Sequence, residues 1–366
     1  MYRSSPKGPR SRCWTSKTSV LCICIVLRFL FFLEGDILTD ANNSKPFKTL
    51  NQQLSILRDR GLDDAHAKAK RSLEQIGYYS LINGYKWMFL ARDSNGEIIH
   101  PEIYKDDASF DEIKSLYDFD FELRSILYRS LLKYETMLGA EIAYRFSEQH
   151  QEEHAYLAMD NFSRDTQQVS SVVGTISSLS STIKKYSDRK GKNAIKHYVN
   201  KHGHVPLWVL VNFLTFGELN YFYANCTRDI QMTIAKDFRH TKCISYGDTH
   251  QPSITPVAIM DINQMVNIFR NAVAHGEITY SKVVYRTPHL GEIKSAAGIR
   301  GVALHSQAGV FELIIAMKAV LPKKNYQRLI KDIDGLLKDS KDRFNPINYS
   351  ALLQDMHFPS NYADVW

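Results

Sequence analysis

The stretch from Ser109 to about Gln149 constrains the fold most, because it predicts one helix far longer than an average helix. Ser109 and Glu112 form the pattern of a capping box, which marks the start of a helix. Hydrophobic residues then recur on two adjoining stripes, so neighbouring elements must cover more than one side. We therefore expect an all-α fold with this helix at its centre. The apolar positions are Ile113, Leu116, Tyr117, Phe121, Leu123, Ile126, Leu127, Leu131, Tyr134, Leu138 and Ile142.

A second helix is predicted from Pro256 to His275. Thr255 is a suitable N-cap, proline favours the first helical position, and Gly276 favours the end of a helix. One side is apolar and the opposite side is polar, as expected for a helix packed on a core. The apolar side has Ile259, Ile262, Val266, Phe269 and Val273, and the polar side has Gln264, Asn267, Asn271 and His275.

Arg270, Asn271 and His275 place a guanidinium, an amide and an imidazole in the last two turns of this helix. Histidine transfers protons near neutral pH and arginine holds two phosphate oxygens at once, so the three are candidate catalytic residues for chemistry on a phosphate. The helix dipole favours charged His275 whereas Arg270 opposes it, which leaves the resting protonation state open. The alternative is a structural helix end, at which His275 caps carbonyl groups and Arg270 makes an ion pair.

The run R-N-A-V-A-H-G-E from Arg270 to Glu277 resembles a known motif. Its R-N-x-x-x-H part is similar to the signature of HEPN ribonucleases, and the A-H-G-E part resembles the Abi (abortive infection) family related to AbiD and AbiF. Four further blocks resemble the same family. They are K-P-F and the following residues at 45–62, the tyrosine-rich run at 78–85, Y-D-F-D-x-x-L-R at 117–124, and P-x-W-V with F-G-x-L at 205–219.

The resemblance implies a HEPN-type helical bundle at residues 106–345. We expect a basic and apolar extension at 1–44, an N-terminal helical subregion at 45–105, and a C-terminal tail at 346–366. It also implies a metal-independent endoribonuclease of phage defence, without a cofactor, whose products carry 2′,3′-cyclic phosphate and 5′-OH ends. Because the chain has one convincing copy of the motif, the resemblance further implies a homodimer with a composite cleft.

Three residues of the long helix are expected to support the site. Asp120 and Arg124 belong to the resembling block at 117–124, and Glu135 follows on the same helix. Glu135 is expected to hold Arg270 or His275 from this neighbouring helix. Where many family members carry an arginine four residues after this glutamate, the chain has Gly139, so a second arginine contact is in doubt.

Residues 184–204 collect basic side chains and are the predicted RNA-binding surface. The alternative is an ordinary solvated face. His197, His202 and His204 follow in the same segment, but no cysteine or clear glutamate ligand stands nearby, so no metal site is predicted. The residues expected to contact RNA are Lys184, Lys185, Arg189, Lys190, Lys192 and Lys196.

The remaining helices are predicted from apolar spacing and helix stop signals. The tyrosines at 78–85 are expected to pack in the core, with base stacking as the alternative. The residues between the block at 205–219 and Thr255 are expected to hold a short helical piece and then a polar stretch. The expected helices span about 50–60, 63–76, 165–183, 205–217, 311–320 and 325–338.

The net charge of +7 and the pI near 8.9 permit a nucleic-acid partner without requiring one. Five cysteines without a disulfide or metal spacing favour a reducing compartment, so we expect a cytoplasmic protein. Basic residues precede an apolar run at 20–33 that is too short to span a bilayer, which makes a membrane partner unexpected. Residues 1–44 are either the product of an upstream start codon or a real anchor or extension.

Two other functions stay open from the sequence. The first is a non-catalytic RNA-binding module, which would hold a structured regulatory RNA. The second is a protein-interaction role, as a phage-sensing or antitoxin-linked scaffold that uses the helical bundle as its docking surface. No P-loop, dinucleotide fingerprint or nucleophile elbow occurs in the sequence.

Overall fold

The computed structural model describes residues 46–247, 253–285 and 289–365, and residues Leu50–Trp366 form one compact unit. Helices are the regular elements of the described residues, which otherwise contain isolated β-bridges, so the predicted all-α fold is confirmed. The apolar run predicted at 20–33 lies outside the described residues. Among the residues that are described, no helix combines the length and apolar character needed to cross a membrane.

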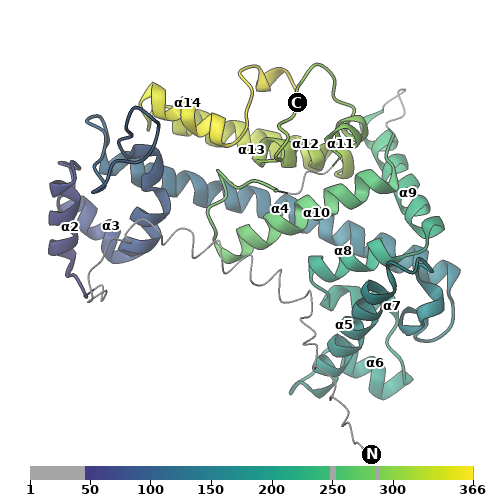
Figure 1. The fold of residues 1–366 in the computed structure, drawn as a ribbon. Coiled ribbons are helices and arrows are strands. Elements are labelled where there is room, and N and C mark those ends of the chain that lie inside the picture. The colour runs from purple at the N-terminus through teal and green to yellow at the C-terminus, as the bar shows by residue number, and fades with distance from the viewer. Residues whose placement is uncertain (1–45, 248–252, 286–288, 366) are drawn as a thin grey trace, which may run out of the picture. The chain divides into compact units, whose positions relative to one another are not determined.

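The predicted long helix is α4, Phe110–Gln149, and it is the element against which most others pack (Figure 1). The side chain of Ser109 accepts hydrogen bonds from the backbone N–H groups of Asp111 and Glu112, as its sequence pattern predicts. The helices that contact α4 include α8, Phe216–Asn225; α9, Arg228–Tyr246; α10, Pro256–His275; and α13, Lys323–Lys341. Of the apolar positions expected to be covered, Phe121 is an exception because its side chain is exposed.

The N-terminal helices are α2, Leu50–Asp59, and α3, Ala67–Ile76. The expectation that α3 begins at residue 63 is wrong, because the Asp64 carboxylate instead accepts hydrogen bonds at the start of α4. Its oxygens accept hydrogen bonds from the Phe110 N–H at 2.9 Å and the Ser109 hydroxyl at 3.0 Å. A π-helix, Tyr79–Asn83, and a 3-10 helix, Lys86–Phe89, then return the chain toward α4.

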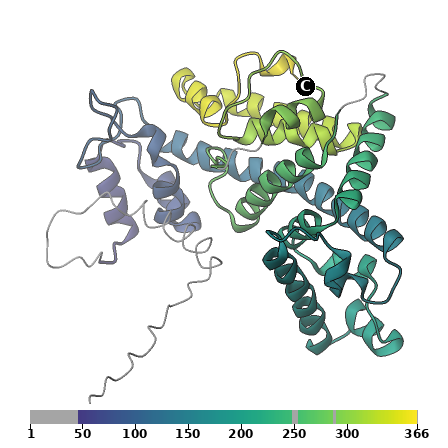
Figure 2. The same cartoon turned by 45° about the vertical axis from the view of Figure 1, so that its right-hand side comes forward.

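Four helices form a group away from α2 and α3, in which α7 and α8 pack on α4, α5 packs on α8, and α6 packs on α5 and α7 (Figure 2). They are α5, Val169–Asp188; α6, Ala194–His202; α7, Leu207–Leu210; and α8, Phe216–Asn225. Short 3-10 turns lie at Ala155–Leu157, Met159–Asn161 and Val211–Phe213. The prediction that Gly217 ends a helix from 205 is wrong. Thr215 and Glu218 form a capping box, so Gly217 lies in the first turn of a new helix.

The prediction of a polar stretch without a helix before Thr255 is also wrong, because most of these residues form α9, Arg228–Tyr246. Ile230, Ile234 and Phe238 are buried at four-residue spacing on its inner side. Two other buried side chains of this helix, Gln231 and Lys242, are polar, so its inner side does not form a continuous apolar stripe in the sequence.

Helix α10, Pro256–His275, begins and ends as predicted, with a Thr255 cap and Gly276 after its last residue. It is followed by α11, Leu290–Ala297; α12, Val310–Val320; α13, Lys323–Lys341; and α14, Pro346–Asp355, with a final 3-10 turn at Tyr362–Asp364. In the segment expected to be a tail, Leu352, Met356 and Phe358 are buried. The domain boundaries at 105 and 345 stay predictions.

Candidate functional site

The candidate site lies at the C-terminal end of α10, where the chain reverses direction. Gly276 has φ of 69°, a left-handed conformation that favours glycine, and its N–H donates to the Ala272 carbonyl. The Glu277 N–H donates to the same carbonyl at 2.9 Å. Asn271 and His275 are exposed beside this turn. Both side chains are therefore accessible to a large substrate.

Arg270 is held by Glu135, as expected from the sequence. Its Nε donates a hydrogen bond to Glu135 Oε2 at 3.2 Å, and the two side chains are 21% and 15% exposed. Arginine carries five N–H donors, and within the described residues Glu135 is the hydrogen-bond partner of this side chain. The Glu135 carboxylate thus orients the Arg270 guanidinium through Nε. The terminal NH₂ groups of Arg270 remain free to bind an oxyanion.

Asp120 holds the chain immediately after the motif. Its carboxylate is fully buried and accepts hydrogen bonds from the N–H of Thr279 at 3.1 Å, the N–H of Tyr280 at 2.7 Å and the Tyr85 hydroxyl at 2.7 Å. It also forms an ion pair with Arg124. Burial raises the pKa of the Asp120 carboxyl. The charge of Arg124 and the hydrogen bonds from Tyr85 and the two amides act in the opposite direction and lower this pKa in part.

Arg124 adds a second contact to the same turn, because it donates to the Glu277 carbonyl at 3.4 Å and to the Tyr85 hydroxyl at 3.1 Å. Among the described contacts, neither Asp120 nor Arg124 touches the side chains of Arg270 or His275. These two supporting residues therefore position the backbone after His275 and not the reacting groups themselves.

Tyr85 is part of this cluster, although only a packing role is predicted for it from the sequence. It is buried, as predicted for the tyrosine-rich run, whereas Tyr79 in the same run is 60% exposed. A buried tyrosine hydroxyl needs a hydrogen-bond partner. This requirement is the one signal in the sequence that could have indicated a contact between Tyr85 and a distant carboxylate.

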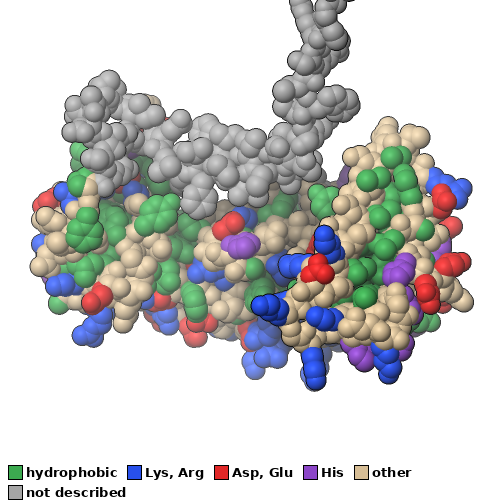
Figure 3. Space-filling view, turned by 90° about the horizontal axis from the view of Figure 1, so that it is seen from below, with side chains coloured by type: hydrophobic (Ala, Val, Ile, Leu, Met, Phe, Trp, Pro, Cys, Tyr) green, Lys and Arg blue, Asp and Glu red, His purple; other side chains and the backbone are tan. Residues whose placement is uncertain are grey.

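The six basic residues predicted to bind RNA lie on the last turn of α5, the following loop and α6. All are exposed except the half-buried Lys196. Within the described residues, none of the six has a carboxylate within ion-pair distance. Figure 3 views this side of the molecule and shows Lys and Arg side chains gathered beside histidines. The segment is therefore a basic surface whose six named cationic side chains make no ion pair within the described residues.

The histidines of this segment do not form a metal site. The rings of His197 and His202 are 6.1 Å apart, and no group of three or more His, Cys, Asp or Glu side chains suited to a metal occurs within the described part of the chain.

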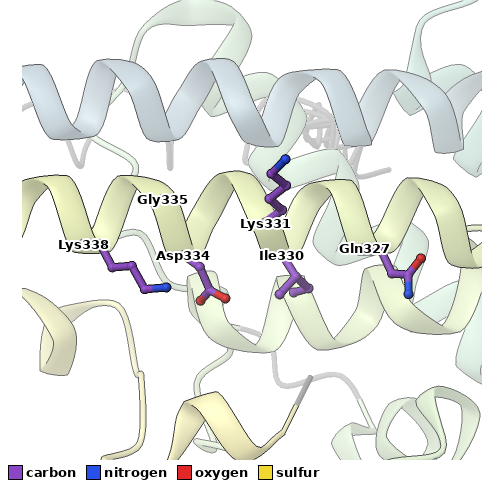
Figure 4. A pocket seen from close by; sticks show the side chains of 6 residues that line it. All are labelled: Gln327, Ile330, Lys331, Asp334, Gly335 and Lys338. Carbon is purple, nitrogen blue, oxygen red and sulfur yellow. The ribbon is translucent and has the colours of Figure 1, made fainter.

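The hollow shown in Figure 4 involves none of the predicted site residues. It has a volume of about 470 Å³ and lies along α13. In Figure 4 the Lys331 side chain points away from Asp334 and Lys338, so the hollow offers no convergent set of catalytic groups.

A family model described as "Abi-like protein" matches residues 71–281, which is more than half of the chain. The matched segment contains Asp120, Arg124 and Glu135 as well as the whole motif from Arg270 to His275. No curated protein and no solved structure matches the chain.

We expect Asp120→Asn to lower the free energy of unfolding by about 3–5 kcal/mol, because an amide leaves Arg124 without its buried counter-ion and turns an NH₂ group toward backbone donors. Urea unfolding would measure this loss. Asp118→Asn is the matched control, since the partly exposed Asp118–Lys114 pair should contribute at most about 1 kcal/mol. Equal losses in the two variants would contradict the role assigned to Asp120.

Proposed function

The chain belongs to the Abi-like protein family, and from this membership and the end of α10 we propose that it acts in abortive infection as an endoribonuclease of the HEPN type. The observation that carries the proposal is the Glu135–Arg270 pair beside the exposed Asn271 and His275. A guanidinium oriented by a carboxylate, with an imidazole five residues later on the same helix, is suited to a phosphodiester. On the same motif we propose that the chain belongs to the AbiD and AbiF branch.

The proposed reaction requires no metal ion. The 2′-oxygen of RNA forms a bond to the adjacent phosphorus as its proton passes to a base, and the bond from phosphorus to the 5′-oxygen breaks as that oxygen receives a proton. The products are a 2′,3′-cyclic phosphate and a 5′-OH. The free NH₂ groups of Arg270 bind the phosphoryl oxygens, and Asn271 orients His275 or the phosphate.

His275 supplies one of the two proton transfers. Because a single imidazole does not readily serve as base and acid in the same step, the second group comes from another copy of the chain. We therefore propose a homodimer in which two α10 ends form one cleft. The exposed position of Asn271 and His275 is compatible with this arrangement.

A non-catalytic RNA-binding role is the second candidate function. It is favoured by the basic surface, whose six cationic side chains have no acidic partner within the described residues. In that case a regulatory RNA is the ligand, and the end of α10 binds phosphate without cleaving it.

We expect His275→Ala to reduce cleavage of cellular RNA in EDTA by about 100-fold or more, because it removes a proton-transfer group. The rate would be measured by gel analysis of labelled RNA. His240→Ala removes an exposed histidine of α9 and serves as the control. Equal rates for the two variants would exclude His275 as a catalytic residue.

Glu135→Gln should lower the cleavage rate by about 10- to 100-fold without unfolding the protein, because Arg270 loses the charge that orients it. Single-turnover kinetics would give the rate, and circular dichroism would verify the fold. Glu122→Gln, at an exposed position of the same helix, should leave the rate unchanged. A Glu135→Gln protein with the full rate would show that the ion pair is only structural.

Replacing Lys190 and Lys192 together by Ala should weaken RNA binding and reduce the salt dependence of affinity. The slope of log K against log salt should decrease in magnitude by about 1.4, because two phosphate contacts are lost on a single strand. Filter binding over a salt series measures it. Lys323 and Lys324, both exposed on α13, provide the matched double substitution. A slope equally reduced by both pairs would indicate a general charge effect and no dedicated surface.

A further inference from the structure

A second cavity lies between the C-terminal end of α4, the segment after it and the start of α7. Its volume is about 270 Å³. Phe146, Tyr156 and Leu207 are buried side chains that form its apolar floor, whereas His154, His204 and Trp208 are more accessible and stand at its rim. An apolar floor with a few polar groups at the edge is typical of a small-ligand site.

The rim is held in place by specific contacts. The Tyr156 hydroxyl donates to the Val205 carbonyl at 2.6 Å, which ties the two sides of the cavity together. The rings of His154 and His204 stand edge to face, with centroids 6.0 Å apart. His154 has φ of 57°, a left-handed conformation that is uncommon for a residue with a side chain. Such strain is often found at binding sites.

Trp208 is the exposed aromatic side chain of the rim. It is 59% exposed although its neighbours Leu207 and Val205 are buried. A large indole left in water at the mouth of a cavity is a suitable surface for a flat ring, because aromatic faces stack on nucleobases irrespective of sequence.

The charges of the cavity favour a base over a phosphate. None of its lining residues is Lys or Arg, and Glu152 and Glu153 contribute carboxylates. Carboxylates repel a phosphate, whereas the edge of a base offers N–H donors to them and acceptors to imidazole N–H groups. The volume lies just below the range of pockets that hold drug-sized molecules, so one base is a suitable occupant.

The position of the cavity connects it with the rest of the proposed RNA path. Phe146 follows Glu135 by eleven residues on α4, which places the two on the same side of the helix, about 16 Å apart along its axis. His204 lies just beyond α6, the helix that carries Lys196 of the basic surface. The cavity is thus adjacent in the chain to both the basic surface and the helix that holds Arg270.

We propose that this cavity binds one unpaired base of the RNA by stacking on Trp208, away from the phosphate that is cleaved. The proposal rests on the proposed function in that its ligand is RNA, but it does not require cleavage. It makes the ligand a single-stranded segment, since a paired base cannot enter.

The test uses the full-length chain with His275→Ala, in EDTA, and a fluorescently labelled single-stranded RNA of twelve nucleotides. Anisotropy gives the affinity for this RNA and for a series in which each base in turn is replaced by an abasic site. Adding Trp208→Ala should weaken binding about 5- to 100-fold. One abasic position should cause a similar loss, and that position should cause no further loss when Trp208 is already replaced.

Two further variants separate stacking from a general effect. Tyr79→Ala removes an aromatic side chain that is 60% exposed outside the cavity, and it should leave the affinity unchanged. His154→Gly relieves the left-handed backbone, so it should keep or raise the melting temperature while weakening RNA binding.

The proposal is overturned if Trp208→Ala binds the RNA as tightly as its parent, or if the abasic losses are the same with and without Trp208. Cleavage by the chain with an intact His275 would then still support the nuclease. Conversely, binding that depends on Trp208 without any cleavage would support the cavity and refute the nuclease. A parent chain that binds no RNA would overturn both.

Discussion

The buried carboxylate of Asp120 is the interaction on which the candidate site depends most. It accepts hydrogen bonds from the backbone N–H groups of residues 279 and 280 and from the hydroxyl of Tyr85, and it forms an ion pair with the guanidinium of Arg124. A carboxylate without solvent is tolerated only when its oxygens are so fully satisfied. The chain after Gly276 is therefore fixed against α4, and with it the position at which α10 ends.

Helix α4 supports both the end of α10 and the second cavity. Four of its side chains make hydrogen bonds to α10 or to the turn that follows it. The Tyr134 hydroxyl donates to Asn263 at 2.6 Å, Glu135 holds Arg270, and Asp120 and Arg124 hold the turn. Farther along, Phe146 forms part of the second cavity. A single 40-residue helix thus sets the spacing between the motif and that cavity.

The sequence predicted the elements whose signals are local. The ends of α4 and α10 agree with the Ser109 and Thr255 caps and with Gly276, because capping depends on residues within one turn. The sequence does not predict helix α9 because polar side chains are among its buried positions. The prediction for Gly217 is wrong because a capping box overrides the usual stop signal of glycine.

The site was predictable only in part, for a similar reason. The Glu135–Arg270 pair was expected from a family resemblance and from the packing of two helices, and the contact is present. Tyr85 donates to Asp120 across 35 positions of the sequence, and the 279–280 amides donate to it across about 160 positions. No local sequence pattern predicts such distant contacts. The same holds for the second cavity, which brings residues 146–156 to residues 204–208.

The central claim is that the end of α10 cleaves RNA without a metal ion, and the chemistry of the product ends tests it most directly. Purified protein would be incubated with cellular RNA in EDTA and the new termini identified by enzymatic end-labelling. We expect 2′,3′-cyclic phosphate and 5′-OH ends that are absent from reactions with His275→Ala. Ends bearing 5′-phosphate, or intact RNA in reactions with the folded wild-type protein, would contradict the account.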